Sequence, residues 1–474
     1  MGLGTLGGGA ASAKWFVAQG ARVTVTDLRT EKQLAPSMKE LGGAAKTMVF
    51  VLGQHREEDF KNNDVIVVNP AVPRESGYLG VAKKKRKIIV NDAHIFFNLV
   101  RTPIVAVTGT RGKTTTTNWV AHFLKSKYPG VTVGGNSSKN ALLSFVGRNK
   151  KTPAVVELSS WQLELLDKAS RGPDVAVITN IYSDHLNRYR NIRDYASAKA
   201  NIFSKQTPSQ KLILNFDNPW TKFFLSKKPK AKVFFFSLKP LPKGKEGMFI
   251  SKNLVILRRG KQERMVLGEK ELGVLQTRGE HNVQNFLAAA LGSVLVGVSI
   301  DAIQKRIKTL PDIQYREEVV LKRKNLLIIN DSAGTSPDAV IAAIRRFKNQ
   351  GNLILITGGT DKNLDFRPLA KEIRETLKPE QVLFLNGSAT KKLIKELRAL
   401  RYFSKTGSRV FEELPEILKG IKNKELGIRD VKRMIPNSRL LILFSPGAAS
   451  FEKFKNEFDR GEKFNVYSKE LFGS

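Results

Sequence analysis

The 474-residue chain contains no cysteine. It therefore has no disulfide bond, no thiolate nucleophile and no metal site with cysteine ligands. It also has no apolar run as long as a membrane span, and its first residues do not form a charged segment followed by an apolar core. We therefore expect a cytoplasmic protein without a signal peptide and without membrane insertion.

Acidic residues are scarce relative to basic ones. The chain has 43 Asp and Glu against 80 Lys and Arg, a formal net charge of +37, which raises the hypothesis of a nucleic-acid or membrane-surface binder. The sharpest basic run, residues 83–87, lies directly before the apolar residues 88–90 and predicts an exposed turn before a strand. No aromatic residues cluster with these charges, and no helix-turn-helix, zinc-finger or RNA-recognition signature occurs. We expect a solvated basic face and no specific nucleic-acid partner.

The stretch from Val105 to Thr117 organises the rest of the chain. The β-branched run at residues 104–107 predicts a buried parallel strand, and an apolar helical pattern follows from Trp119. Between them, Gly109 and Gly112 predict a tight turn. Backbone N–H groups and the helix dipole make such a strand–turn–helix junction an anion site.

The side chains after this turn suit a bound phosphate. Lys113 supplies a full positive charge, and Thr114 offers the hydroxyl that Mg²⁺ needs. The common P-loop has four residues between its glycines, whereas this turn has only Thr110 and Arg111. An ordinary glycine turn is the alternative, and we favour phosphate binding.

The chain begins with a second glycine pattern, G-x-G-x-x-G, at residues 2–7. A predicted helix at residues 11–19 and a strand at residues 23–26 follow, and the strand ends at Asp27, where an acidic side chain suits a ribose hydroxyl. The pattern lacks its leading strand, so we expect either a truncated N-terminus or a fold without that strand. Strands near residues 64–68 and 87–90 complete a small α/β domain.

The length predicts about three domains, which we place at residues 1–100, 101–310 and 311–474. In the second region Glu157 ends a predicted buried strand beside the P-loop, where a Mg²⁺ ligand belongs. His185 follows a further strand, and spacing alone favours a surface histidine over a metal ligand. Asn282 and Asn285 share one face of a predicted amphipathic helix.

In the third region three predicted strands each end in a polar turn. They cover residues 326–329, 353–356 and 440–443. Strands alternating with helices predict an open α/β sheet with its site at the carboxyl ends of the strands. The chain has no long-period repeat and no low-complexity linker, so we expect closely joined domains.

These segments together resemble the Mur ligases, the ATP-dependent amide ligases of peptidoglycan precursor synthesis. The resemblance covers nearly the whole chain and rests on the short P-loop, Glu157 to Glu164, Asp184-His185-Leu186, His281 to Asn285, Asn330-Asp331-Ser332, Gly358 to Lys362, and Ser445 to Gly461. The Ser-Ser-aromatic-Gln-Leu-Glu element at residues 159–164 is similar to that of the D-glutamate-adding branch.

The resemblance implies three α/β domains: a Rossmann-like domain for UDP, a central P-loop ATPase domain with a mainly parallel sheet, and a Rossmann-like C-terminal domain for the amino acid. It implies that a carboxylate of UDP-N-acetylmuramoyl-L-alanine attacks ATP to give an acyl phosphate, which the amine of D-glutamate then attacks. ATP and two Mg²⁺ ions are the implied cofactors, and we expect a monomer.

The resemblance also assigns roles to individual residues. ATP binding falls on the P-loop and on residues of the second and third domains: Gly109, Thr110, Arg111, Gly112, Lys113, Thr114, Thr115, Asn282, Asn285, Arg316 and Asp331. The UDP substrate falls on Thr5, Leu6, Asp27, Leu28, Arg29, Asn69, Asn136 and Ser159, and D-glutamate on Thr335, Lys362 and Ser450. Lys113, Glu157, His185 and Lys199 match catalytic positions, and Thr114, Glu157, His185 and Lys199 match metal ligands.

Lys199 enters the metal set as a carbamate. It matches the lysine that relatives modify with CO₂, whereas most helix lysines are plain surface residues. An ammonium beside Mg²⁺ would repel the metal, but a carbamate inverts the charge and offers the hard oxygen ligands that Mg²⁺ prefers. We therefore expect a carbamylated Lys199.

Three positions depart from the family pattern. Ala333 stands where many relatives have lysine, Tyr315 where histidine is common, and Asn69 where serine is frequent. None removes a core catalytic group, although the first removes a cationic contact near the acyl phosphate. Alternatives are a Mur ligase adding L-alanine or a diamino acid, a folylpolyglutamate synthetase, and, outside this class, a basic nucleic-acid-binding P-loop ATPase.

Overall fold

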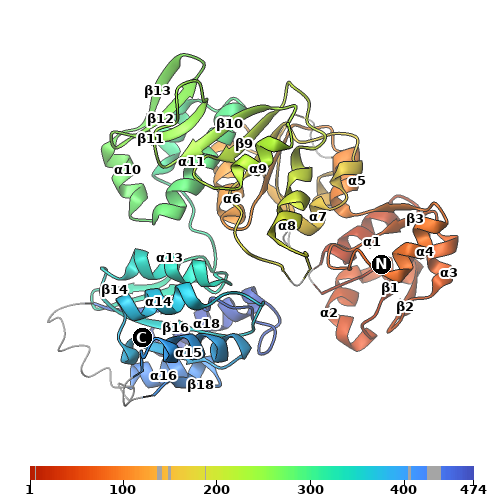
Figure 1. Ribbon diagram of the computed structural model, residues 1–474. Helices are drawn as coiled ribbons and strands as arrows, with labels where there is room; N and C mark the ends of the chain where they lie inside the picture. The colour runs from red at the N-terminus through yellow and green to blue at the C-terminus, as the bar shows by residue number, and fades with distance from the viewer. Residues whose placement is uncertain are drawn as a thin grey trace. The chain divides into compact units, whose positions relative to one another are not determined.

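The computed structural model describes residues 1–5, 7–135, 141–147, 151–186, 188–403, 407–423 and 439–473 (Figure 1). They form two compact units. The first comprises Met1–Tyr182, Arg188–Gly273 and Asn282–Pro311, and the second Ser183–Asn187, Val274–His281 and Asp312–Ser474. The predicted α/β class is confirmed. Within the described residues, no helix is long and apolar enough to cross a membrane.

The first unit begins with two parallel strand pairs. β1 (Val23–Asp27) pairs with β2 (Met48–Leu52), and β3 (Val65–Val67) pairs with β4 (Ile88–Val90). The helices of this region are α1 (Gly8–Ala18), α2 (Glu31–Leu41), α3 (Glu57–Asn62), α4 (Gly77–Lys84) and α5 (Asp92–Leu99), with a 3-10 helix η1 (Gly42–Thr47). The basic run at residues 83–87 lies at the end of α4 and in the turn before β4, as predicted.

The first residues of the chain link these two pairs. The amide of Gly2 donates to the carbonyl of Thr26 at 2.7 Å. The amino group of Met1 donates to the carbonyl of Val67 at 2.9 Å. Residues 1–3 thus take the place between β1 and β3 that a leading strand would occupy in a β-α-β unit.

A nine-stranded sheet forms the rest of the first unit, in the order β13-β12-β11-β10-β9-β8-β5-β7-β6. Its strands are β5 (Ile104–Thr108), β6 (Val133–Gly135), β7 (Ala154–Glu157), β8 (Val175–Ile178), β9 (Lys211–Asn215), β10 (Lys232–Ser237), β11 (Gly247–Ser251), β12 (Leu254–Arg259) and β13 (Gln262–Leu267). The seven strands from β11 to β6 in this order run parallel, with β5 among them. Strands β12 and β13 add an antiparallel ribbon that the sequence analysis did not predict.

Helices cover both faces of this sheet, and as a result every residue of β5, β7 and β8 is buried. Ile104 and Ala106 pack in a cluster with Phe96 of α5. On the opposite face, α11 packs close to β9, because a Cβ built on Gly292 would lie 3.7 Å from Cδ1 of Ile213. The helices are α6 (Lys113–Leu124), α7 (Ser160–Leu163), α8 (Ile192–Ala200), α9 (Thr221–Ser226), α10 (Glu269–Gln276), α11 (Glu280–Leu295) and α12 (Ile300–Ile307), with 3-10 helices η2 (Leu142–Phe145), η3 (Leu166–Lys168) and η4 (Asn201–Phe203).

The second unit is built on a six-stranded sheet in the order β14-β15-β19-β16-β17-β18. Its strands are β14 (Glu318–Arg323), β15 (Leu326–Asn330), β16 (Asn352–Thr357), β17 (Val382–Leu385), β18 (Arg409–Phe411) and β19 (Leu440–Phe444). Only β14 is antiparallel to its neighbour. The three predicted strands, β15, β16 and β19, are adjacent, so their polar carboxyl ends meet at one edge.

Alternating side chains of these strands pack into two apolar layers, one on each face of the sheet. Leu327, Leu353 and Leu441 pack on one face with α13 (Pro337–Phe347), α14 (Arg367–Thr376) and α15 (Ser388–Ala399). Ile328, Ile354 and Ile442 pack on the other with α16 (Leu414–Lys422) and α18 (Glu457–Phe472). A 3-10 helix η5 (Pro379–Gln381) precedes β17.

Candidate functional site

The P-loop joins β5 to α6 at the centre of the nine-stranded sheet. Helix α6 begins at Lys113, six residues earlier than its apolar pattern indicated. Asn180, which follows β8, holds the loop by accepting from the amide of Thr110 at 2.9 Å and from the amide of Arg111 at 2.8 Å. The ammonium of Lys113 donates to the carbonyl of Thr110 at 3.1 Å, so this cation lies over the loop.

Both glycines of the loop are required by its geometry. Gly109 has a φ of 147°, and a Cβ there would lie 1.9 Å from Oγ1 of Thr179. Gly112 has a φ of 77°, and a Cβ there would lie 2.1 Å from Oδ1 of Asn285. The backbone therefore turns tightly into the helix N-terminus, as the close approach of a phosphate requires.

Two asparagines of α11 lie beside this loop. Asn285 accepts at Oδ1 from the hydroxyl of Thr116, at 3.3 Å, and its amide donates to Oδ1 of Asn282, at 3.2 Å. The prediction that they share a helix face is thus confirmed. Their amides give the P-loop helix polar neighbours in addition to its own N-terminus.

Two charged residues of the predicted metal set are buried in the first unit. Glu157 ends β7, directly beside β5, and is 7% exposed. Lys199 of α8 is 1% exposed, so it is not the plain surface lysine of the alternative hypothesis. Its Nζ lies 3.4 Å from Oγ1 of Thr108, the last residue of β5, and 4.7 Å from the centre of the Tyr195 ring.

These groups have the chemistry that ATP and Mg²⁺ require. The loop offers a helix N-terminus and Lys113 for phosphate, and Glu157 and Thr114 offer hard oxygen atoms for a divalent ion. Among the described residues, no group of three His, Asp or Glu side chains forms a preassembled metal cage.

His185 belongs to the short segment 183–187 that is grouped with the second unit. It has a φ of 55°, its amide donates to Oδ1 of Asp184 at 2.9 Å, and its side chain is 34% exposed. Its role as a metal ligand stays a prediction.

The N-terminal glycine loop gathers several of the residues assigned to UDP. The carboxylate of Asp27 accepts from the amides of Gly4 and Arg29, at 3.0 and 2.9 Å. Asn69 packs on the other side, because a Cβ on Gly2 would lie 3.0 Å from Cβ of Asn69. Thr5 is exposed and Leu28 is 66% exposed. Leu6 and Asn136 lie outside the described residues.

A charged cluster that the sequence analysis missed lies between this loop and α7. The carboxylate of Glu164 pairs with the guanidinium groups of Arg74 and Arg188 and accepts from the hydroxyl of Tyr189. Each donor atom lies within 2.9 Å of a carboxylate oxygen. Burial raises the pKa of Glu164, but the hydrogen bonds from Arg188 and Arg74 outweigh it, so the pKa lies below its ordinary value. Ser159 caps α7 at its other end and exchanges hydrogen bonds with Gln162.

In the second unit Asp331 is buried at the carboxyl end of β15. It accepts from the hydroxyl of Ser445 at 2.7 Å and from the amide of Glu317 at 3.3 Å. Burial, followed by the nearby charge of Glu317, raises the pKa of Asp331 to about 7. Arg316, which directly precedes Glu317 in sequence, donates to the carbonyl of Ala333 at 3.5 Å.

Glu317 itself belongs to a second cluster that the sequence analysis missed. It pairs with His281 at 3.2 Å and with Arg346. Burial lowers the pKa of His281, but the charge of Glu317 and the hydrogen bond to it outweigh that effect, so the pKa of His281 is raised.

The residues assigned to D-glutamate lie on adjacent loops. The ammonium of Lys362 donates to the hydroxyl of Thr335 at 3.0 Å. The loops that carry Lys362 and Ser450 are joined by two backbone hydrogen bonds of 2.9 Å between Thr360 and Ala449. Ser450 is 3% exposed, and its hydroxyl has no hydrogen-bond partner among the described residues.

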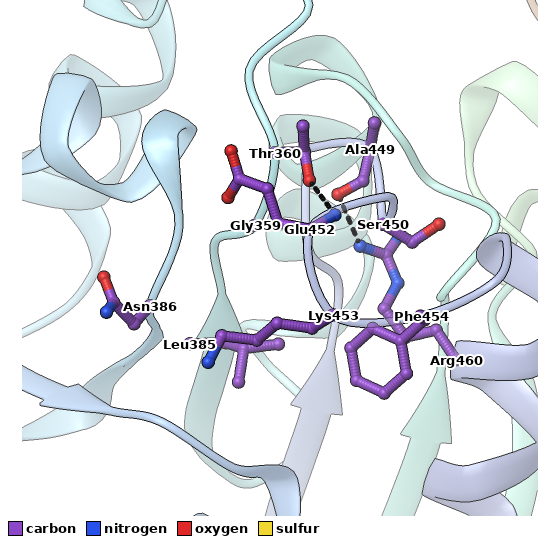
Figure 2. Close-up of a pocket in the computed structure, with 10 residues that line it drawn as sticks. All are labelled: Gly359, Thr360, Leu385, Asn386, Ala449, Ser450, Glu452, Lys453, Phe454 and Arg460. Atoms are coloured by element: carbon purple, nitrogen blue, oxygen red, sulfur yellow. Dashed lines mark hydrogen bonds between the residues drawn. The ribbon is translucent and has the colours of Figure 1, made fainter.

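Ser450 also lines a pocket of about 170 Å³ at the carboxyl ends of β16, β17 and β19 (Figure 2). The wholly buried guanidinium of Arg460 fixes its wall by donating to the carbonyls of Ala448 and Ala449, each at 3.0 Å. Burial lowers the pKa of Arg460 to about 10, which still leaves it charged at neutral pH.

Comparison with known proteins places this geometry in context. The family model of the Mur ligase middle domain matches residues 107–292, and that of the MurD-like N-terminal domain matches residues 1–91. The chain is 36% identical to a UDP-N-acetylmuramoylalanine–D-glutamate ligase of Roseiflexus sp., over 98% of this chain and 96% of the relative. It is 34% identical to the ligase of that name from Borreliella afzelii, over 98% and 95%.

Solved structures share the fold at lower identity. The UDP-N-acetylmuramate–alanine ligase MurC of Thermotoga maritima has a TM-score of 0.59 and 20% identity, covering 99% of this chain and 98% of its own. MurF of Thermotoga maritima in complex with ADP has a TM-score of 0.55 and 16% identity, covering 88% and 97%.

Proposed function

Because the chain belongs to the Mur ligase family, we propose that it is a D-glutamate ligase whose first unit binds ATP at the P-loop edge and whose second unit binds D-glutamate at the edge that carries Lys362 and Ser450. The reaction is the ATP-dependent addition of D-glutamate to UDP-N-acetylmuramoyl-L-alanine, which yields an amide, ADP and phosphate in peptidoglycan precursor synthesis. The tight Gly109–Gly112 turn with Lys113 above it is the observation that carries the ATP half of the proposal.

In the first step the alanyl carboxylate attacks the γ-phosphorus of ATP to give an acyl phosphate and ADP. Lys113 and the amides at the start of α6 hold the phosphates and neutralise charge that develops on them, as in other phosphoryl transfers. Asn282 and Asn285, together with Arg316 and Asp331, hold the rest of the nucleotide.

Thr114, Glu157, His185 and carbamylated Lys199 would hold Mg²⁺, which supplies charge neutralisation at the phosphates. The burial of Lys199 beside Thr108 supports the carbamate, because a buried site favours the neutral amine that CO₂ requires. In that modification the Nζ–C bond forms and one proton leaves to water.

In the second step the amine of D-glutamate attacks the acyl carbon and phosphate departs. Lys362 is the cation that receives a carboxylate of D-glutamate, and the hydroxyls of Thr335 and Ser450 supply further donors. The buried hydroxyl of Ser450, which has no partner among the described residues, supports this role since such groups normally meet a ligand or water. Asp27, Arg29 and Asn69 hold the UDP end, and Ser159 lies near the muramoyl-alanine end.

The test is the substrate requirement for phosphate release. We expect release only when ATP, Mg²⁺, UDP-N-acetylmuramoyl-L-alanine and an amino acid are all present. ATP hydrolysis that RNA or DNA stimulates without the nucleotide sugar would instead support the basic P-loop ATPase. The domain limits 1–100, 101–310 and 311–474 remain part of the proposal.

A further inference from the structure

We infer that Glu164, clamped between Arg74 and Arg188, is a positioning residue that sets the span between the two ends of the UDP-linked substrate. This inference rests on the proposed function, since it concerns how that substrate is held. The cluster contains no atom that we assign to ATP, Mg²⁺ or D-glutamate.

The carboxylate of Glu164 has its acceptor sites filled by three side chains. Arg188 donates from Nε to Oε1 at 2.9 Å and from Nη2 to Oε2 at 2.7 Å, a two-pronged pairing. Nε of Arg74 lies 2.9 Å from Oε2, and the hydroxyl of Tyr189 donates to Oε1 at 2.8 Å. The Glu164 side chain is only 6% exposed, so this charge is weakly screened by solvent.

The cluster ties together two parts of the chain that are distant in sequence. Arg74 ends the turn 69–74, and Nη2 of Arg188 also donates to the carbonyl of Val72 in that turn, at 3.1 Å. Glu164 directly follows α7, and Arg188 stacks over the ring of Trp161 in α7 at 4.7 Å. The turn is therefore bound to α7 through one carboxylate and two guanidinium groups.

Each of these two parts carries one end of the proposed substrate site. The turn packs on the N-terminal glycine loop, because a Cβ on Gly2 would lie 3.0 Å from both Asn69 and Val72. At the other side, α7 begins at Ser160, and its capping residue Ser159 lies two residues after Glu157 at the end of β7. Glu164 thus links the loop proposed for UDP to the segment in which Ser159 is proposed to lie near the muramoyl-alanine end of the substrate.

Charge makes this link sensitive to a single substitution. Two guanidinium groups share one carboxylate, and the other acid that pairs with Arg74 among the described residues is Asp194, at the longer distance of 3.9 Å. Without the charge of Glu164 the two cations repel each other at a half-buried site. The turn should then shift relative to α7, while each part keeps its own internal hydrogen bonds.

Binding affinities for a long ligand and a short one distinguish a positioning role of Glu164 from a role in general stability of the fold. UDP occupies only the glycine-loop end, whereas UDP-N-acetylmuramoyl-L-alanine spans both ends. For Glu164→Gln we expect unchanged affinity for UDP and an unchanged KM for ATP. Affinity for the UDP-sugar should fall by about tenfold, which corresponds to ~1.4 kcal/mol, because its two ends can no longer both reach their sites without strain. Arg188→Lys keeps the charge but loses the two-pronged pairing, so it should show a smaller loss of the same kind.

The matched control is Glu246→Gln. Glu246 also forms a carboxylate–cation pair in the first unit, with Lys232 at 2.7 Å, but it precedes β11 and lies outside the cluster. It should leave both affinities unchanged. Should Glu164→Gln fail to fold, as judged by circular dichroism, Arg74→Gln carries the test, because it keeps the Glu164–Arg188 pair and should still weaken only the UDP-sugar.

Two results would overturn the inference while leaving the proposed function intact. One is a parallel loss of UDP and UDP-sugar affinity, which indicates general destabilisation, and the other is no loss of either. If the unaltered protein binds no UDP-N-acetylmuramoyl-L-alanine, the proposed function fails and the inference fails with it.

Discussion

Replacing Gly112 by alanine adds one carbon atom to the P-loop and tests whether its close contact with Asn285 matters for ATP binding. The substitution places a Cβ at a φ of 77°, which costs a residue with a side chain about 1–2 kcal/mol of folding free energy. That Cβ would also lie 2.1 Å from Oδ1 of Asn285, so the asparagine has to move. Asn285 then loses its hydrogen bond with Thr116, and the first turn of α6 is disturbed.

Gly20→Ala is the matched control. Gly20 has a φ of 80°, and no atom lies within 4 Å of a Cβ built there. In urea denaturation the free energy of unfolding of both variants should fall by about 1–2 kcal/mol, because alanine is strained at a positive φ. Only Gly112→Ala should lower kcat/KM for ATP in a phosphate-release assay, by about tenfold, which corresponds to ~1.4 kcal/mol. Equal ATP kinetics in the two variants would refute the contact between the P-loop and α11 as a functional element.

Three further outcomes are expected. Lys113→Ala should reduce turnover by about 100-fold or more with an unchanged circular dichroism spectrum; near-normal phosphate release would exclude this loop as the catalytic one. Lys199→Ala should be inactive and regain activity with added short-chain carboxylic acids, whereas full activity without them would reject the carbamate. The pKa of Asp331 is raised from its ordinary value of 3.8 to about 7. The folded state therefore binds the Asp331 proton more tightly than the unfolded state does. As a result, the contribution of Asp331 to the free energy of unfolding falls as the pH rises from 3.8 to about 7. Asp331→Asn should therefore match the unaltered protein in urea denaturation near pH 4 and become progressively more stable than it up to about pH 7; an advantage independent of pH would contradict this assignment.

Local sequence patterns predicted much of the fold and of the phosphate site. The P-loop could be predicted because the strand, the glycines and the helix start lie within about a dozen residues. The contacts with Thr179 and Asn285 that require the two glycines come from distant segments and were not indicated by the spacing. The central strands of both sheets, such as β5 and β16, could be predicted because all their residues are buried and mostly apolar, whereas the antiparallel strands β12 and β13 were not predicted.

Contacts between distant segments could not be predicted in this way. Arg74 and Glu164 are 90 residues apart, and neither has a flanking motif that names the other as its partner. The same holds for His281, Glu317 and Arg346, whose pairing depends on the packing of the second unit. Residues 1–3 offered no strand pattern, because glycine and methionine there carry little β propensity, yet backbone hydrogen bonds seat them between β1 and β3.

The identity of the added amino acid tests the central claim most directly. The measurement is phosphate release from ATP with UDP-N-acetylmuramoyl-L-alanine and, in turn, D-glutamate, L-glutamate, L-alanine and meso-diaminopimelate, with the product mass determined in each case. The account predicts release with D-glutamate alone and a product heavier by one glutamyl residue. Turnover with any of the other amino acids in preference to D-glutamate would contradict it.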